Sequence, residues 1–166
     1  SFDNLHRGAG VADREYFTFH EQNASLIAHI GPAIRSRQNG EWIIPVSRRL
    51  NDQDGNFQGV LMAGIKMSYF DRFFRSFSLD DQGEMALALS DGTLLARRPF
   101  DQARIGHPLG EENIFKHDAA SVMASDAVIR SAIDGVVRLY GHQHLQAYPL
   151  VVTAAVLARA LLAGLP

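Results

Sequence analysis

Four side chains with the chemistry to hold a small ligand lie in the first third of the sequence. They are Tyr16, His29, Trp42 and Arg48. A guanidinium group binds a carboxylate through two parallel hydrogen bonds, and each of the three rings joins an apolar body to a polar edge. The set favours a pocket for a small molecule such as a carboxylate or an amino acid, although such rings also occur in cores and at pocket rims.

Arg48 is one of two adjacent arginines in a segment that is predicted to be a strand, the other being Arg49. Neighbouring strand residues point to opposite faces, so only one of the two can face a given pocket. The alternative is that both arginines are solvated, or that they pair with Asp13, Asp52 or Asp54, because an exposed arginine is the ordinary case. One arginine of the pair is therefore a candidate contact for an anionic ligand, and solvation or pairing with an aspartate stays the alternative.

Metal binding and catalysis have less support in the sequence. His142 and His144 share one face of a predicted strand, but two imidazoles without a carboxylate or cysteine partner are not a metal site, and surface histidines are the alternative. The sequence holds no Gly-x-Ser-x-Gly, Walker, dinucleotide-binding or His-Glu-x-x-His motif. We therefore expect no catalytic residue, no metal and no cofactor, and a small hydrolase or metalloprotein is the least supported function.

Composition excludes several classes of partner and site. The formal net charge of −2 favours neither nucleic acid nor an anionic membrane surface as a partner. The absence of cysteine excludes disulfides and thiolate sites, and it fits an extracytoplasmic domain. The chain begins with Ser1, and its nearest approach to a membrane span, residues 150–162, is interrupted by Arg159 and too short. We expect an excised soluble piece of a larger protein, tied to a membrane only through missing flanking helices.

Hydrophobic periodicity and turn residues predict helices that alternate with hairpins. Strands are expected at residues 26–34, 42–50, 57–65, 84–97 (a hairpin), 136–145 and 150–157. Helices are expected at residues 13–20, 68–77 and 111–133, and from residue 158. Asp54-Gly55 and Asp91-Gly92 are the expected hairpin turns, and Asp13 and Ser68 the expected helix N-caps. Strands that cluster into hairpins indicate an α+β fold with antiparallel sheets.

Longer motifs resemble a known family of sensors. ADREYF, IGPAIRS, WIIPVSRRL, DGNFQGVLMAGI and YFDRFF resemble the later half of the membrane-distal module of a double Cache domain. LSDGTLLARRP, IGHPL, DGVVRLYGHQHL and YPLVVTAAV resemble its membrane-proximal module. Such regions are similar to the periplasmic input domains of diguanylate cyclases, sensor histidine kinases and chemoreceptors.

The resemblance implies a PAS-like fold of antiparallel sheets flanked by helices. It implies two modules, a membrane-distal one with its linker helix at residues 1–79 and a membrane-proximal one at residues 80–166. The family's long N-terminal helix and the first two distal strands have no counterpart, so a truncated distal module with an open sheet edge is expected. The strand that carries Arg48 borders the ligand pocket in the family, which supports this arginine. The spaced Tyr-Arg-Trp-Tyr-Asp set by which some double Cache domains bind amino acids has no convincing match.

The leading hypothesis is an extracytoplasmic small-molecule sensor of a transmembrane signalling protein. This fragment is expected to have no enzymatic activity, whereas a cyclase or kinase output domain can belong to the full protein. Ligand binding would favour one arrangement of sheet and helices, which requires unequal affinity for two states. The alternative is a ligand-free dimerisation or scaffold module, favoured if the aromatic side chains of the 68–77 helix face solvent. A homodimer is compatible with both.

Overall fold

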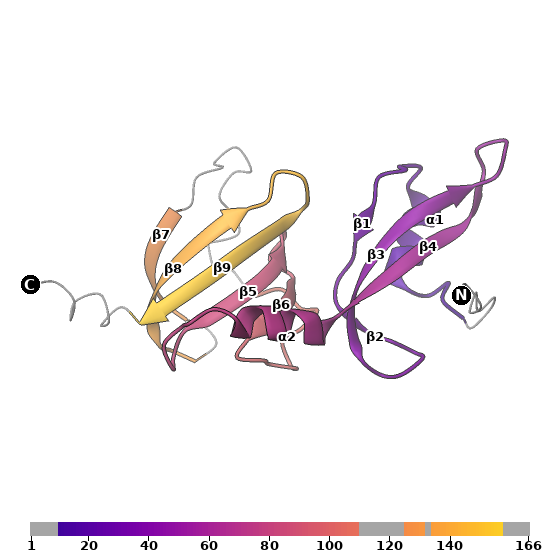
Figure 1. Cartoon of the computed structure of the whole chain (residues 1–166). Helices are drawn as coiled ribbons and strands as arrows, with labels where there is room; N and C mark the ends of the chain where they lie inside the picture. The colour runs from indigo at the N-terminus through magenta and orange to yellow at the C-terminus, as the bar shows by residue number, and fades with distance from the viewer. Residues whose placement is uncertain (1–9, 110–124, 132–133, 158–166) are drawn as a thin grey trace, which may run out of the picture. The chain divides into compact units, whose positions relative to one another are not determined.

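The computed structural model of the chain describes residues 10–109, 125–131 and 134–157 (Figure 1). The chain divides into two compact units, the first made of residues 1–31 and 44–65 and the second of residues 32–43 and 66–166. Each unit combines sheet with helix, and the paired strands are mostly antiparallel, so the predicted α+β class is confirmed. The module limits expected from the sequence, 1–79 and 80–166, stay a prediction.

One long strand organises the four-stranded sheet A. This strand, β3 (Trp42–Asn51), pairs with β1 (His29–Ile30), β2 (Ile34–Arg35) and β4 (Phe57–Lys66), and its pairs with β1 and β2 are antiparallel. Its β-branched and aromatic residues suit this shared position. The single strand predicted over residues 26–34 is wrong, because Gly31-Pro32-Ala33 separates β1 from β2 and proline has no N–H to donate to the sheet.

The predicted Asp54-Gly55 turn joins β3 to β4. Gly55 has a φ of +87°, a conformation that glycine adopts at little cost. Asp52 Oδ1 accepts hydrogen bonds from the backbone N of Asp54 and of Asn56, at 3.0 and 2.8 Å. Asp52 therefore closes the turn, and within the described residues it forms no ion pair with the neighbouring arginines.

Helix α1 (Glu15–Gln22) begins one residue later than an Asp13 cap requires. Its N-cap is Arg14, which makes no side-chain capping bond. A preceding turn, closed by a hydrogen bond of 2.9 Å from Arg14 N to Val11 O, shifts the start of the helix. The prediction of Asp13 as the cap is therefore wrong.

Sheet B forms the centre of the second unit. Its strand order is β6 (Leu94–Arg98), β5 (Glu84–Leu89), β9 (Leu150–Leu157), β8 (Val137–His144), β7 (Ser125–Arg130), with antiparallel neighbours throughout. Leu94, Leu95 and Val151 have no exposed surface, which places the core on this sheet. The predicted Asp91-Gly92 turn is also present, because Asp91 Oδ1 accepts the Thr93 N–H at 2.8 Å.

The helix predicted over residues 111–133 is wrong at its end. Residues 125–130 form strand β7, which pairs with β8 from Ser125–His142 to Arg130–Val137. Gly135 has a φ of +72° and lies in the hairpin turn between the two strands, so Asp134-Gly135 turns a hairpin instead of ending a helix. Pairing with β8 overrides the helical pattern. The rest of that predicted helix, and the one expected from residue 158, lie outside the described residues.

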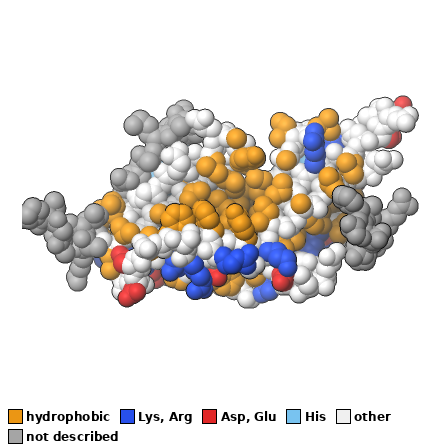
Figure 2. All heavy atoms as spheres, viewed as in Figure 1, with side chains coloured by type: hydrophobic (Ala, Val, Ile, Leu, Met, Phe, Trp, Pro, Cys, Tyr) orange, Lys and Arg blue, Asp and Glu red, His pale blue; other side chains and the backbone are white. Residues whose placement is uncertain are grey.

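Helix α2 (Met67–Arg75) follows β4 without a linker. Its N-cap is therefore Lys66 and not the predicted Ser68. The helix is held to the second unit by the buried Phe74, whose carbonyl accepts a hydrogen bond of 2.9 Å from Arg98 Nη1. Figure 2 shows hydrophobic side chains gathered on the side of the second unit that carries α2. None of the helices within the described residues is long and apolar enough to cross a membrane.

Candidate functional site

The first unit holds a buried imidazole between α1 and β3. The His20 side chain is fully buried, with its Nε2 3.1 Å from Ser47 Oγ. Its Nδ1 is also buried and has no hydrogen-bond partner among the described residues. Burial lowers the pKa of His20 below its usual value of 6.5, with the nearby His29 and Arg49 as smaller causes in the same direction. The site therefore holds a neutral imidazole with one unused polar atom.

Two of the predicted ligand contacts lie beside His20. Tyr16 is one helical turn earlier in α1 and is 5% exposed. The His29 ring stacks on Phe19 with 3.6 Å between ring centroids, and His29 Nε2 lies 2.7 Å from Glu15 Oε1. Both contacts come from α1, so His29 faces the α1 side of sheet A. The structure thus brings Tyr16 and His29 to the same side of the sheet.

The two adjacent arginines differ in their roles. Arg49 faces α1, where its Nη1 donates hydrogen bonds to the carbonyl oxygens of His20 and, at 3.3 Å, of Asn23. Its guanidinium carbon lies 4.7 Å from the centroid of the Phe57 ring. Arg49 therefore satisfies carbonyls at the C-terminus of α1, where a cation is favourable. Arg48 is exposed on the opposite face of β3, away from α1.

Trp42, the fourth predicted contact, belongs to the second unit. It pairs with Arg35 of β2, whose guanidinium carbon is 4.8 Å from the indole centroid. Trp42 Nε1 is buried without a hydrogen-bond partner in the described part of the chain. The structure therefore groups Tyr16 with His29 and places Arg48 on the other face of sheet A. A pocket lined by all four residues stays a prediction.

Sheet B carries a buried set of charged and polar side chains that the sequence-based interpretation missed. We call it the Glu84 cluster: Glu84, Arg97, Arg138 and Tyr140. Glu84 Oε2 lies 3.2 Å from Arg97 Nη2 and 3.6 Å from Arg138 Nη1. Tyr140 donates its hydroxyl to Glu84 Oε1 at 2.6 Å. Both guanidinium groups are almost fully buried, with 5% and 4% of their side chains exposed, so removing the Glu84 carboxylate would take away a partner that both buried charges share.

Asp134 extends this cluster towards solvent. Its two carboxylate oxygens accept hydrogen bonds from Arg138 Nη1 and Nη2 at 2.8 and 2.6 Å. This bidentate pair holds the pKa of Asp134 well below its usual value and raises the pKa of Arg138. Burial, with help from Glu84, raises the pKa of Tyr140 to about 12. Asp134 and Arg138 therefore stay charged, and Tyr140 stays protonated, at neutral pH.

Alternation along β8 was the signal that could have revealed the cluster. Arg138, Tyr140 and His142 recur at every second position and are all buried on one face. Polar residues in this spacing ordinarily mark the solvent face of a strand. Only the pairing of β8 through β9 to β5 brings the polar face onto Glu84.

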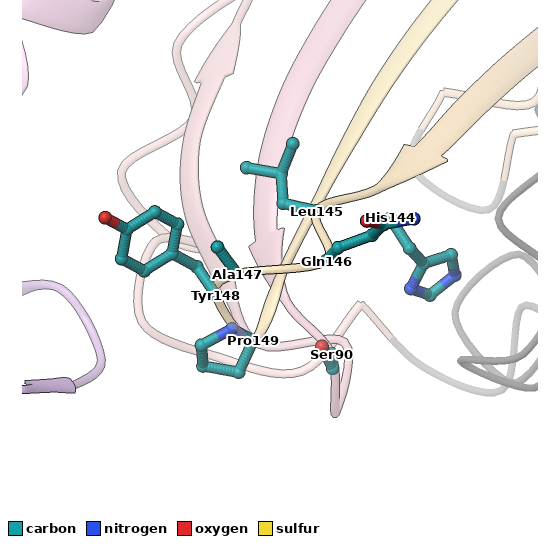
Figure 3. Close-up of a pocket in the computed structure, with 7 residues that line it drawn as sticks. All are labelled: Ser90, His144, Leu145, Gln146, Ala147, Tyr148 and Pro149. Atoms are coloured by element: carbon teal, nitrogen blue, oxygen red, sulfur yellow. The ribbon is translucent and has the colours of Figure 1, made fainter. Parts of the chain in front are cut away.

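A surface pocket of about 330 Å³ lies at the turn between β8 and β9 (Figure 3). It is lined by Ser90 and residues 144–149. The rings of His144 and Tyr148 point to opposite sides of the turn in Figure 3. Because ligand sites need polar groups that converge on one point, this pocket has little to orient a ligand.

The histidine pair of β8 gains no third ligand in the described part of the chain. The ring centroids of His142 and His144 are 5.8 Å apart. Among the described residues, no group of three or more histidines, cysteines or carboxylates is placed to hold a metal ion. The arrangement gives no support to the metal-site alternative.

Comparison with known proteins points to one family. A family model described as a histidine kinase sensor domain of the dCache_1-like type matches residues 67–155, which is more than half of the 166-residue chain. No curated protein matches the sequence.

Three solved structures illustrate the similarity. The extracellular domain of rpHK1S-Z16, assigned as a histidine kinase, is 33% identical, with a TM-score of 0.77 over 93% of this chain and 63% of that one. The periplasmic sensory domain of the Campylobacter jejuni chemoreceptor Tlp1 is 14% identical, with a TM-score of 0.74 over 94% and 59% of the two chains. The ligand-binding domain of the Pseudomonas aeruginosa amino acid chemoreceptor PctB, in complex with L-Gln, is 13% identical, with a TM-score of 0.69 over 98% and 64%.

These similarities differ in what they show. The two chemoreceptor domains, at 14% and 13% identity, show the fold alone. The chain spans less than two thirds of the length of the structures it matches. Their descriptions as extracellular or periplasmic domains agree with the predicted extracytoplasmic location, and the predicted resemblance is confirmed. By its match to the family over more than half of its length, the chain belongs to the dCache_1-like histidine kinase sensor domains.

Proposed function

We propose that this chain senses a small molecule for a transmembrane signal-transduction protein and is the extracytoplasmic part of that protein. The observation that carries the proposal is membership of a family of sensor domains. The fold shared with a ligand-binding domain of an amino acid chemoreceptor supports it. In this role the chain binds a ligand without catalysing a reaction, and a separate output domain, a kinase or a cyclase, responds to the binding.

Amino acids are the first ligand class to test. PctB, which is similar in fold, holds L-Gln. The predicted contacts offer a partner for either charge of a zwitterion, but on opposite faces of sheet A: on the face away from α1, the guanidinium group of Arg48 can bind the carboxylate. On the α1 side, Glu15 beside His29 offers a carboxylate to the ammonium group. The chemistry of the predicted residues is therefore compatible with an amino acid ligand.

The α1 side of sheet A is the preferred location for the pocket. Tyr16 and His29 lie there together with the unused Nδ1 of His20. Arg48 is on the opposite face of β3, and one small ligand cannot contact both faces of a sheet. A contact with Arg48 therefore defines a competing location, and mutagenesis separates the two.

Transmission of the signal requires that the ligand bind two arrangements of the sensor with unequal affinity. Arg49 links the last carbonyls of α1 to β3. A ligand that contacts Tyr16 or His29 would therefore bias helix and strand together. This coupling supplies the first step of a relay towards an output domain.

Calorimetric titration of the 166-residue chain with L-glutamine and the other common L-amino acids tests the proposal. We expect binding heat and a concentration-dependent rise in Tm with at least one of them. Tyr16→Phe and His29→Gln should each weaken that binding by about tenfold, the effect of losing one hydrogen bond to a charged group. Tyr69→Phe, which removes the hydroxyl of an exposed tyrosine of α2, is the matched control and should leave the affinity unchanged.

Two results would contradict parts of this proposal. Binding that is lost in Arg48→Gln and kept in His29→Gln would move the pocket to the opposite face of sheet A. If no amino acid, carboxylate, amine or sugar binds the wild-type chain or raises its Tm, the ligand-sensing role of this chain is excluded.

A dimerisation or scaffold module is the second candidate, favoured by the exposed aromatic side chains on and just after α2. Tyr69, Phe73 and Phe77 are 52%, 45% and 43% exposed. Analytical ultracentrifugation over a range of concentrations tests it. A dimer that is lost in Phe73→Ser, and kept in the control Arg72→Ser on the same helix, would support this function. A monomer at every concentration would contradict it.

A further inference from the structure

The buried face of sheet B has small residues between its polar side chains. Ala86 pairs with Arg97 on β6 and with Thr153 on β9, and Thr153 pairs with His142 on β8. Directly paired residues of antiparallel strands share a face. The four residues therefore form one row across four strands, and all of them are at least nine-tenths buried.

The next row along the same face is Glu84, Ala155 and Tyr140. Two alanines, Ala86 and Ala155, thus form a floor that is bordered by polar side chains. Adjacent strands lie about 4.8 Å apart, so the row from Arg97 to His142 spans roughly 14 Å of backbone. The side chains of this floor are single methyl groups, smaller than the Leu or Phe side chains that would pack such a face more fully.

Arg97 is the member of the Glu84 cluster whose hydrogen bonding is incomplete. Its Nη2 lies 3.2 Å from Glu84, but its buried Nη1 has no hydrogen-bond partner among the described residues. Asp101 Oδ2 is 4.0 Å from that Nη1, beyond hydrogen-bond distance, and it also pairs with Arg104 at 3.6 Å. A buried charged donor without an acceptor is costly, and such a group points to an ion or ligand that completes it.

Arg138, on the same face, has a hydrogen-bond acceptor at each of its three guanidinium nitrogens. Its Nε donates to Gln82 O at 2.6 Å, and both of its Nη atoms bind Asp134. Arg97 shares its Glu84 oxygen with Arg138, whose Nη1 lies 3.6 Å from the same Oε2, and its second ion pair, with Asp101, is long at 4.0 Å. Arg97 is therefore the less neutralised of the two buried guanidinium groups.

We propose that the second unit binds a small carboxylate over Ala86, with Arg97 as its main contact. A carboxylate supplies the acceptor that Nη1 lacks, and arginine is the side chain best suited to hold it. The site shares no residue with the proposed pocket on the α1 side of sheet A. The chain would then respond to two ligands, one in each unit.

Titration of the 166-residue chain with sodium acetate at constant ionic strength tests this inference, with acetamide as the uncharged probe of the same shape. Acetate should bind with one-to-one stoichiometry and raise Tm, whereas acetamide should do neither. Arg97→Gln should weaken acetate binding by about tenfold or more, as expected for the loss of a charge-assisted hydrogen bond. Arg98→Gln is the matched control, since Arg98 is the next residue, donates to Phe74 O at 2.9 Å and should not affect acetate affinity.

A second variant covers the case in which Arg97→Gln does not fold. Ala86→Val keeps every charged group and adds two methyl groups to the floor, so it should abolish acetate binding while the circular dichroism spectrum stays unchanged. Absence of acetate binding to the wild type, equal binding of acetamide, or full affinity in folded Arg97→Gln would each overturn the inference. L-Glutamine binding measured in Arg97→Gln and in His29→Gln separates the two sites, because it should depend on His29 and not on Arg97.

Discussion

The two units bury polar groups in different ways. In the first unit the buried pair is neutral, the imidazole of His20 against the hydroxyl of Ser47. In the second unit it is ionic, with Glu84 between two guanidinium groups. A neutral buried group is disturbed by gaining a proton, whereas a buried ion is disturbed by losing its partner. The first unit should therefore be sensitive to mild acid, and the second to mutation.

Glu84→Ala should have the largest effect on stability. It leaves Arg97 and Arg138 without their shared carboxylate, and breaking a buried ion pair in this way costs about 3–5 kcal/mol. Urea unfolding of the variant and the wild type measures the difference. Ser47→Ala is the corresponding change in the first unit and should cost only about 1–2 kcal/mol. Equal losses in the two variants would contradict the contrast between the units.

Arg49→Ala should have an intermediate effect. The change removes hydrogen bonds from a charged group to the last carbonyls of α1 and the contact with Phe57, at a cost of about 1.5–3 kcal/mol. Arg48→Ala, one residue earlier on the exposed face, should stay within about 0.5 kcal/mol of the wild type. Thermal unfolding of the two variants measures this difference in stability. A larger loss of stability in Arg48→Ala than in Arg49→Ala would contradict the orientation of β3.

Mild acid should destabilise the first unit through His20. Its pKa is lowered in the folded state, so this contribution to stability is fully present above pH 6.5. As the pH falls below 6.5 the unfolded chain takes up the proton first, and the free energy of unfolding decreases by at most about 1.4 kcal/mol per pH unit. Urea unfolding at pH 7.5 and pH 5.5 should show this loss, and His20→Gln should reduce it. An identical pH dependence in the variant would rule His20 out as its source.

Asp134→Asn should have a small effect at neutral pH, about 1 kcal/mol, because Asp134 is partly exposed and Arg138 keeps other partners. The pKa of Asp134 is lowered by Arg138, so its contribution is present above pH 3.8 and is lost as the pH falls further. Acid unfolding can be followed by circular dichroism. The loss of stability that the wild type shows below pH 3.8 should be smaller in the variant. A change confined to pH 5–6.5 would contradict this assignment.

The sequence predicted the fold better than it predicted the site. Local turn chemistry located the hairpins at Asp54-Gly55 and Asp91-Gly92, where an Asp carboxylate and a glycine with positive φ shape the turn, but it misread Asp134-Gly135 as a helix end. The same reasoning failed at residues 125–130, where apolar residues at helical spacing form β7 and pair with β8. The difference is that a strand is fixed by its partner, which lies elsewhere in the sequence.

The candidate sites depend still more on long-range pairing. Tyr16 and His29 lie on the same side of sheet A, but the faces of Arg48 and Arg49 become clear only from the contacts of Arg49 with α1. Glu84 lies more than fifty residues before Tyr140, and no local pattern joins them. Polar residues that alternate in a strand predict a solvent face, and here they form a buried one.

Hydrogen–deuterium exchange of the 166-residue chain, with and without a saturating mixture of the common L-amino acids, tests the sensor account most directly. The account predicts slower exchange in α1, β1 and β3, because a ligand on the α1 side of sheet A stabilises the backbone around Tyr16 and His29. Unchanged exchange throughout that region would contradict it.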